Sequence, residues 1–128
     1  MKAVDEIRAA LAQCYGSENW YKMGFLFPRM YLTDGAKTVA DMCEAHWLMA
    51  AIASHQPSCL KDDMLKEVQF WTFKKKGEGW VLICERDSGN VFFTQDIDFS
   101  DFPFPEGIKL YVKPLDEKNY TIMLPSEN

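Results

Sequence analysis

The pattern of hydrophobic and polar positions changes its period once along this chain. Up to residue 60, apolar residues recur at every third or fourth position, which is typical of amphipathic helices. From residue 66 to 125 they alternate with polar residues or gather in short runs of β-branched and aromatic side chains, which is typical of strands. We therefore predict a single domain over residues 1–128, with a helical and strap part at 1–60 and a β part at 66–125.

Residues 3–15 are predicted to form a first amphipathic helix, because their apolar side chains fall on one face. The segment 17–32 (SENWYKMGFLFPRMYL), which we name the strap, is crowded with aromatic residues but interrupted by Gly24 and Pro28. Neither residue suits the interior of a long helix or strand. We therefore expect an irregular segment whose rings pack under the helices.

The longest helical pattern runs over residues 33–55, and we expect the rest of the chain to be organised around it. Thr33 or Asp34 can cap its start, because a short side-chain oxygen accepts a hydrogen bond from a free backbone N–H. Pro57 ends it, since the residue before a proline avoids helical geometry. Residues 45–53 are apolar on almost every side, so this half of the helix should be covered nearly all round.

The β part predicts strands at residues 68–74, 80–86, 91–97, 108–113 and 120–124. Glycine-containing connections at 76–79 and 87–90 suit hairpin turns. The segment 98–107 contains two prolines and cannot continue a ladder, so it should cross the end of the sheet with some of its phenylalanines in the core. The predicted fold class is α+β, with two N-terminal helices packed on a four- to five-stranded antiparallel β-sheet meander.

The first three predicted strands are apolar on both faces. A sheet with one face in water would not need this pattern. We expect either the strap or a second subunit to cover the second face, and a homodimer is therefore one of two alternatives.

Charge is unevenly distributed, although 48% hydrophobic and 26% charged residues are ordinary for a globular domain. The segment 85–106 carries six acids against one arginine, a net charge of −5 that equals that of the whole chain. This balance argues against direct binding to a phosphate backbone and is compatible with a basic partner. We predict a partner-binding surface at Glu85, Asp87, Asp96, Asp98, Asp101 and Glu106.

The start of the chain has neither the continuous apolar run of a secretion signal nor that of a membrane anchor. The four cysteines are therefore interpreted as reduced thiols in the cytoplasm rather than as two disulfides. No membrane association is expected.

The pairs Cys43-x-x-His46 and His55-x-x-x-Cys59 resemble a zinc-binding pattern. On one helix, however, Cys43 and His55 would lie roughly 18 Å apart, too far to share an ion. Cys43 and His46 could pair as nucleophile and base, but no oxyanion site or cleft is indicated. We predict no metal, no cofactor and no catalytic residue.

Two further patterns are explained by local structure. Residues 96–101 resemble the start of a calcium loop, but its required glycine and glutamate are replaced by Asp101 and Gly107. The run Lys74–Lys76 lies at a predicted hairpin tip, where a solvated turn is the ordinary interpretation.

The chain resembles a family of small bacterial and mobile-element proteins known as a domain of unknown function. The resemblance covers roughly residues 31–112 and implies no activity, cofactor or catalytic residue. It depends on segments at residues 31–35 (YLTDG), 47–48 (WL) with 52–54 (IAS), 70–72 (FWT), 84–89 (CERDSG), 94–97 (TQDI), 100–103 (SDFP) and 108–112 (IKLYV).

The leading hypothesis is a non-enzymatic protein-binding accessory module, encoded by a phage or mobile element as the resemblance implies, that acts through the acidic surface. A first alternative is a small-molecule-binding protein or minor enzyme, with a pocket between the strap and the central helix near Tyr31, Cys43 and His46. A second is an acidic mimic that inhibits a DNA- or RNA-binding protein, which predicts strong sensitivity to salt.

Overall fold

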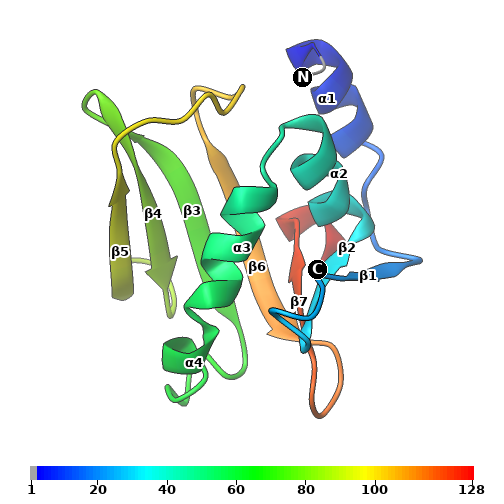
Figure 1. Ribbon diagram of the computed structural model, residues 1–128, viewed down its shortest axis with the longest axis vertical. Coiled ribbons are helices and arrows are strands. Elements are labelled where there is room, and N and C mark those ends of the chain that lie inside the picture. The colour runs from blue at the N-terminus through cyan, green and yellow to red at the C-terminus, as the bar shows by residue number, and fades with distance from the viewer. Residues whose placement is uncertain (1–2) are drawn as a thin grey trace.

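The computed structural model describes residues 3–128 and shows helices packed on one face of a seven-stranded sheet (Figure 1). The predicted mixed α+β class is confirmed. None of the helices within residues 3–128 has the length and apolar character needed to span a bilayer. The elements are α1 (Val4–Leu11), β1 (Trp20–Lys22), β2 (Met30–Thr33), α2 (Asp34–Met42), α3 (His46–Ser54), α4 (Gln56–Cys59), β3 (Gln69–Lys76), β4 (Gly79–Glu85), β5 (Val91–Ile97), β6 (Ile108–Pro114), β7 (Tyr120–Met123) and the 3-10 helix η1 (Pro125–Glu127).

The strands lie in the order β1-β2-β7-β6-β3-β4-β5. The meander β3-β4-β5 and the strands β6 and β7 lie close to their predicted positions. The predicted sheet of four or five antiparallel strands was wrong. The sheet has two more strands, and it is mixed because β2 runs parallel to β7, pairing residues 30–32 with 120–122.

The two additional strands come from the strap, which we had predicted to be irregular. They are only three and four residues long, too short for a two-residue period to be recognised. Gly24 and Pro28 lie in the connection between the two strands. They therefore limit the length of the strands but do not prevent strands from forming on either side. The strap thus extends the sheet at one edge, and its connection lies against α3 and α4.

The helix predicted over residues 33–55 is broken between α2 and α3. Glu44 adopts a left-handed φ of 52°, a conformation that a regular helix does not contain. The N–H of Ala45 then bonds to the carbonyl oxygen of Ala40 at 2.9 Å and closes α2. The break allows α2 to pack beside β2 and β7 while α3 crosses the middle of the sheet (Figure 1).

An aromatic cluster fills one end of the core. Phe73 stacks on Trp80 with ring centroids 4.7 Å apart, and Phe102 packs edge-on against both rings. The proline-containing segment thus supplies core side chains as predicted, although its Phe99 is 81% exposed. Gly107 has a φ of +79°, and a Cβ there would overlap the carbonyl oxygen of Phe73, so only glycine fits this return into β6.

A buried amide pair joins α4 to the sheet. Gln56 and Gln69 are 4% and 0% exposed, and each side-chain amide donates to the other at 2.9 and 2.8 Å. Gln69 Oε1 also accepts from Trp71 Nε1 at 2.9 Å, while the two amides donate to the carbonyl oxygens of Ile52 and Leu65. Every buried polar atom of this network therefore has a partner.

The start of α2 is held by the last turn of the chain. Thr33 caps the helix as predicted, accepting from the N–H of Ala36 at 3.2 Å. The carboxylate of Glu127 accepts from the N–H of Gly35 at 2.9 Å and from the Thr33 hydroxyl at 2.6 Å. A negative charge at a helix N-terminus is stabilising, because it faces unpaired N–H groups.

The second face of the sheet is covered neither by a helix (Figure 1) nor by the strap in the part of the chain that the structure describes. The expectation that the strap folds over this face was wrong, because its strands lie within the sheet. Phe70, Ile83 and Tyr111 are half-buried there, and the rings of Phe70 and Tyr111 pack edge to face at 4.9 Å. A homodimer through this face stays a prediction.

Candidate functional site

The acids of the predicted partner-binding surface lie at two opposite ends of the sheet. Glu85 and Asp87 are at the turn between β4 and β5, whereas Asp96, Asp98 and Asp101 are at or beyond the end of β5. With a rise of about 3.4 Å per residue, the length of β5 separates the two groups by roughly 20 Å. The structure does not bring them together in one patch.

Several of these acids bind groups within the chain. Asp96 pairs with Lys76 at 3.2 Å, and Glu85 accepts a backbone N–H of the turn that follows it at 2.8 Å. Glu106 pairs with Arg8, whose hydrogen bond lowers the pKa of that carboxyl. Binding of a partner by these acids remains a prediction, and it would involve separate groups of residues rather than one continuous acidic surface.

The three residues of the alternative pocket are also apart. Tyr31 points to the opposite side of the sheet from its buried neighbour Leu32. Cys43 is buried, which raises its pKa to about 11. The His46 side chain is 63% exposed and its Nε2 lies 2.8 Å from Asp41. Within residues 3–128 no hydrogen bond joins Cys43 to His46, so the nucleophile–base pair is not formed.

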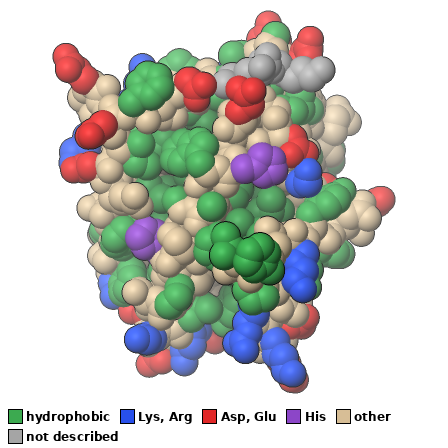
Figure 2. All heavy atoms as spheres, viewed as in Figure 1, with side chains coloured by type: hydrophobic (Ala, Val, Ile, Leu, Met, Phe, Trp, Pro, Cys, Tyr) green, Lys and Arg blue, Asp and Glu red, His purple; other side chains and the backbone are tan. Residues whose placement is uncertain are grey.

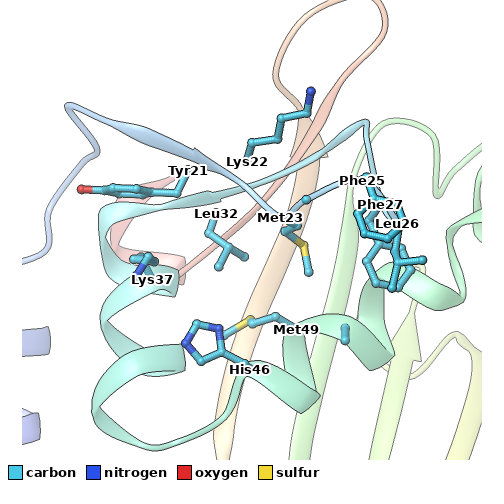
Figure 3. Close-up of a pocket in the computed structure, with 12 residues that line it drawn as sticks. Tyr21, Lys22, Met23, Phe25, Leu26, Phe27, Leu32, Lys37, His46 and Met49 are labelled. Atoms are coloured by element: carbon cyan, nitrogen blue, oxygen red, sulfur yellow. The ribbon is translucent and has the colours of Figure 1, made fainter.

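A pocket of about 350 Å³, which we name the α3 pocket, does lie between the strap and α3. Figure 3 shows Met23 and Leu32 extending from the strap towards His46 and Met49 of α3. Of the predicted residues, only His46 lines it. The full lining is Tyr21, Lys22, Met23, Gly24, Phe25, Leu26, Phe27, Leu32, Lys37, His46, Met49 and Ala50.

The polar end of the α3 pocket is internally paired. Lys37 donates to Asp41 at 2.6 Å, and this hydrogen bond, followed by that of His46, lowers the pKa of Asp41. The hydrogen bond between Tyr21 and Asp34 raises the pKa of the tyrosine. The rim can orient a ligand, but the charge of Lys37 is already compensated by Asp41.

Beside this pocket, residues 24–27 form a tight turn, which we name the strap turn. The N–H of Phe27 bonds to the carbonyl oxygen of Gly24 at 3.2 Å, and Gly24 has a φ of +118°. The two central residues, Phe25 and Leu26, are 88% and 72% exposed. Large apolar side chains are thus displayed at the tip of an ordered turn.

A second depression, the α4 groove, lies on the other side of the strap turn and has a volume of about 260 Å³. Leu26 and Phe27 line both depressions. No acid is among the lining residues of the α4 groove, whereas two exposed cations, Arg29 and Lys118, are at its rim. Its lining is Leu26, Phe27, Pro28, Arg29, Met30, Ala53, Gln56, Pro57, Leu60, Lys118 and Tyr120.

The side chains of this region are suited to binding. Two apolar depressions flank two exposed apolar side chains, an arrangement found at interfaces. Within residues 3–128, no group of three or more His, Cys, Asp and Glu side chains is placed to hold a metal ion.

Two of the cysteines pair in the core. Cys59 and Cys84 hydrogen-bond to each other, which raises the pKa of Cys84.

Sequence reasoning missed the strap turn and the α4 groove. A signal was present, because Phe25 and Leu26 lie between Gly24 and Pro28, two residues that mark turns. Apolar residues at the centre of a turn are unusual, since such positions favour Gly, Pro, Asn, Asp and Ser. The groove had no such signal, because helix and strap residues far apart in sequence line it.

Comparisons with known proteins give a fold and a family. A solved protein of unknown function from Enterococcus faecalis is 16% identical and matches with a TM-score of 0.58, over 86% of this chain and 98% of that one. At this identity the likeness concerns the fold alone. No curated protein matches the sequence significantly. The family of unknown function DUF6876 matches residues 5–128. The resemblance to such a family is confirmed, and the chain belongs to DUF6876.

Proposed function

We propose that this protein is a non-enzymatic module that binds a partner protein through the strap turn and the two depressions beside it. The exposure of Phe25 and Leu26 at the centre of an ordered turn carries this proposal. These side chains contribute little to the packing of their own chain. Aromatic and aliphatic anchors presented next to apolar depressions are the usual centre of a protein–protein interface.

Burial of the two strap-turn side chains would supply part of the free energy of an interface, and contacts in the two depressions would have to supply the rest. Burying a Phe or Leu side chain contributes about 1.5–3 kcal/mol, so this pair supplies about 3–6 kcal/mol before the costs of association. A complex of micromolar affinity needs about 8 kcal/mol. The backbone hydrogen bonds of the turn hold the backbone of both residues in place, so little backbone freedom is lost on binding.

The role we propose is that of an accessory protein, encoded by a phage or another mobile element. The resemblance of the segments within residues 31–112 implies this context, whereas the matched family carries no statement of it. Asp98 and Asp101, which are exposed beyond β5, are proposed as secondary contacts for basic groups of the partner.

The test compares capture of the partner by three forms of the tagged protein in native host lysate, with identification by mass spectrometry. Phe25→Ser/Leu26→Ser should lose the partner that the unmodified protein retains. Phe99→Ser is the matched control, because Phe99 is equally exposed but lines neither depression. Retention of the same partner by the double variant, with folding unchanged by circular dichroism, would contradict the proposal.

A second candidate function is small-molecule binding in the α3 pocket. Its volume falls within the range of ligand sites, and it combines apolar walls with Lys37 and His46. A thermal-shift screen of metabolites, nucleotides and carboxylates tests this function. A genuine ligand should raise the melting temperature, and Ala50→Trp, which fills the pocket, should abolish the shift. A shift that persists in Ala50→Trp would place the ligand elsewhere.

A further inference from the structure

We infer that the partner presents an acidic, apolar segment to the α4 groove. In this arrangement, an apolar side chain enters the groove beside Leu26, and a neighbouring carboxylate pairs with Arg29 and Lys118. The inference rests on the proposed function and adds the chemistry of the partner to it.

The shape of the α4 groove fits a side chain better than a whole small ligand. At about 260 Å³ it is smaller than the usual 300–1,000 Å³ of a drug-sized site. Its walls are apolar, with Phe27 from the strap on one side and Pro57 and Leu60 from the α4 region on the other. Leu26, 72% exposed, stands at its edge and would be covered by the same segment.

The charges at the groove select an acidic segment. Arg29 and Lys118 are exposed and form no ion pair within residues 3–128, as is also true of other exposed lysines such as Lys22 and Lys61. Arg29 and Lys118 differ from those lysines in that both line the α4 groove. The nearby acid Asp116 accepts side-chain and backbone N–H bonds of its own turn, and these bonds, followed by the charge of Lys118, lower its pKa. A cationic rim on a chain of net charge −5 gives carboxylates a local attraction and repels basic segments.

The two cations line the same groove, and their backbone segments are joined. The N–H of Tyr120 bonds to the carbonyl oxygen of Arg29 at 2.9 Å, which joins the loop of Lys118 to the strap connection. On the helical face, many Lys and Arg side chains lie along the lower edge, where some acidic ones also lie, and most acidic side chains lie along the upper edge, with hydrophobic side chains between them (Figure 2). One segment can therefore meet an apolar centre and a basic margin together.

A membrane surface is the rival occupant, because exposed Phe and Leu side chains next to cations also suit a bilayer. The observations favour a polypeptide. A bilayer surface would cover Phe25 and Leu26 but has no side chain to fill the depressions on either side. The net charge of −5 also opposes approach to anionic lipid.

The test uses three hexapeptides with a central Leu-Phe pair flanked on each side by two aspartates, two serines or two lysines. Binding is followed by the amide NMR signals of Ala53, Leu60 and Tyr120. The aspartate peptide should bind most tightly, and the lysine peptide should leave these signals unmoved. In Arg29→Glu/Lys118→Glu, affinity for the aspartate peptide should fall roughly five- to thirtyfold. The matched control Lys74→Glu/Lys109→Glu, with exposed cations on the second sheet face, should bind like the unmodified protein.

Equal binding of the aspartate and lysine peptides, or no movement of the groove signals with any peptide, would overturn the inference. So would binding to phosphatidylglycerol vesicles that is lost in Arg29→Glu/Lys118→Glu. The proposed function is tested separately by the partner captured from lysate. If capture of that partner requires Phe25 and Leu26 but not Arg29 and Lys118, the proposed function is supported and the inferred acidic segment is refuted. If it depends on neither pair, both fail.

Discussion

Replacing Gln69 with leucine removes the centre of the buried network that joins α4 to the sheet. The substitution takes hydrogen-bond partners from Trp71 Nε1, from Gln56 Oε1 and from the carbonyl oxygen of Leu65. A buried polar group left without a partner costs about 1–3 kcal/mol, and the added apolar surface of leucine offsets part of the sum. We expect Gln69→Leu to lower the free energy of unfolding by about 3–5 kcal/mol.

The assay is urea denaturation followed by tryptophan fluorescence, to which the buried Trp71 and Trp80 contribute together with the more exposed Trp20 and Trp47. In Gln56→Leu/Gln69→Leu both amides are absent, so the loss should be smaller than the sum of the single losses by at least about 1.5 kcal/mol. Gln13→Leu, an exposed glutamine, is the control and should change stability by less than about 0.5 kcal/mol. A loss below about 1 kcal/mol for Gln69→Leu, or strict additivity, would refute the network as described.

Three further predictions concern the helix cap, acid stability and thiol reactivity. Glu127→Ala should lower the free energy of unfolding by about 1–2 kcal/mol in urea titrations, because the start of α2 loses its acceptor, whereas the exposed Glu117→Ala should be neutral. The Arg86 guanidinium lowers the pKa of Asp62 in the folded protein. The contribution of the ionised Asp62 to the free energy of unfolding is therefore complete above about pH 4 and is lost as pH falls through the folded pKa. In urea titrations between pH 6 and 3, Asp62→Asn should flatten the decline of the free energy of unfolding with falling pH. With DTNB at pH 8, Cys14 should react first, while Cys43 and the other buried thiols react only after urea unfolding. Fast reaction of more than one thiol in the folded protein would contradict this burial.

The β part was largely predictable because its information is local. The strands β3, β4 and β5 are seven or eight residues long and joined by glycine-containing turns, so period and turn signals agree. The role of 98–107 as a sheet crossing followed from two prolines that cannot join a ladder.

The strap and the helix break depend on distant contacts. Strand β2 is defined by its parallel pairing with residues 120–122, ninety positions later in the chain, and no local pattern encodes such a partner. The break at Glu44 occurs inside a segment of strong helical period, and the packing of α2 and α3 on different parts of the sheet overrides that period. The acidic residues were visible in sequence, and their division between the two ends of β5 could have been deduced from the predicted turn at 87–90 and strand at 91–97.

The apolar stretch at residues 45–53 connects the core to the proposed surface. Its composition predicted cover on nearly every side, and the sheet supplies this cover on one side of α3 while the strap connection supplies it on the other. The strap cover is incomplete, because Ala50 still lines the α3 pocket and Ala53 the α4 groove. The strap turn stands between these two gaps with Phe25 and Leu26 exposed. A partner segment that fills the gaps would complete the burial of α3, so the surface proposed for binding is the part of the core that this chain leaves open.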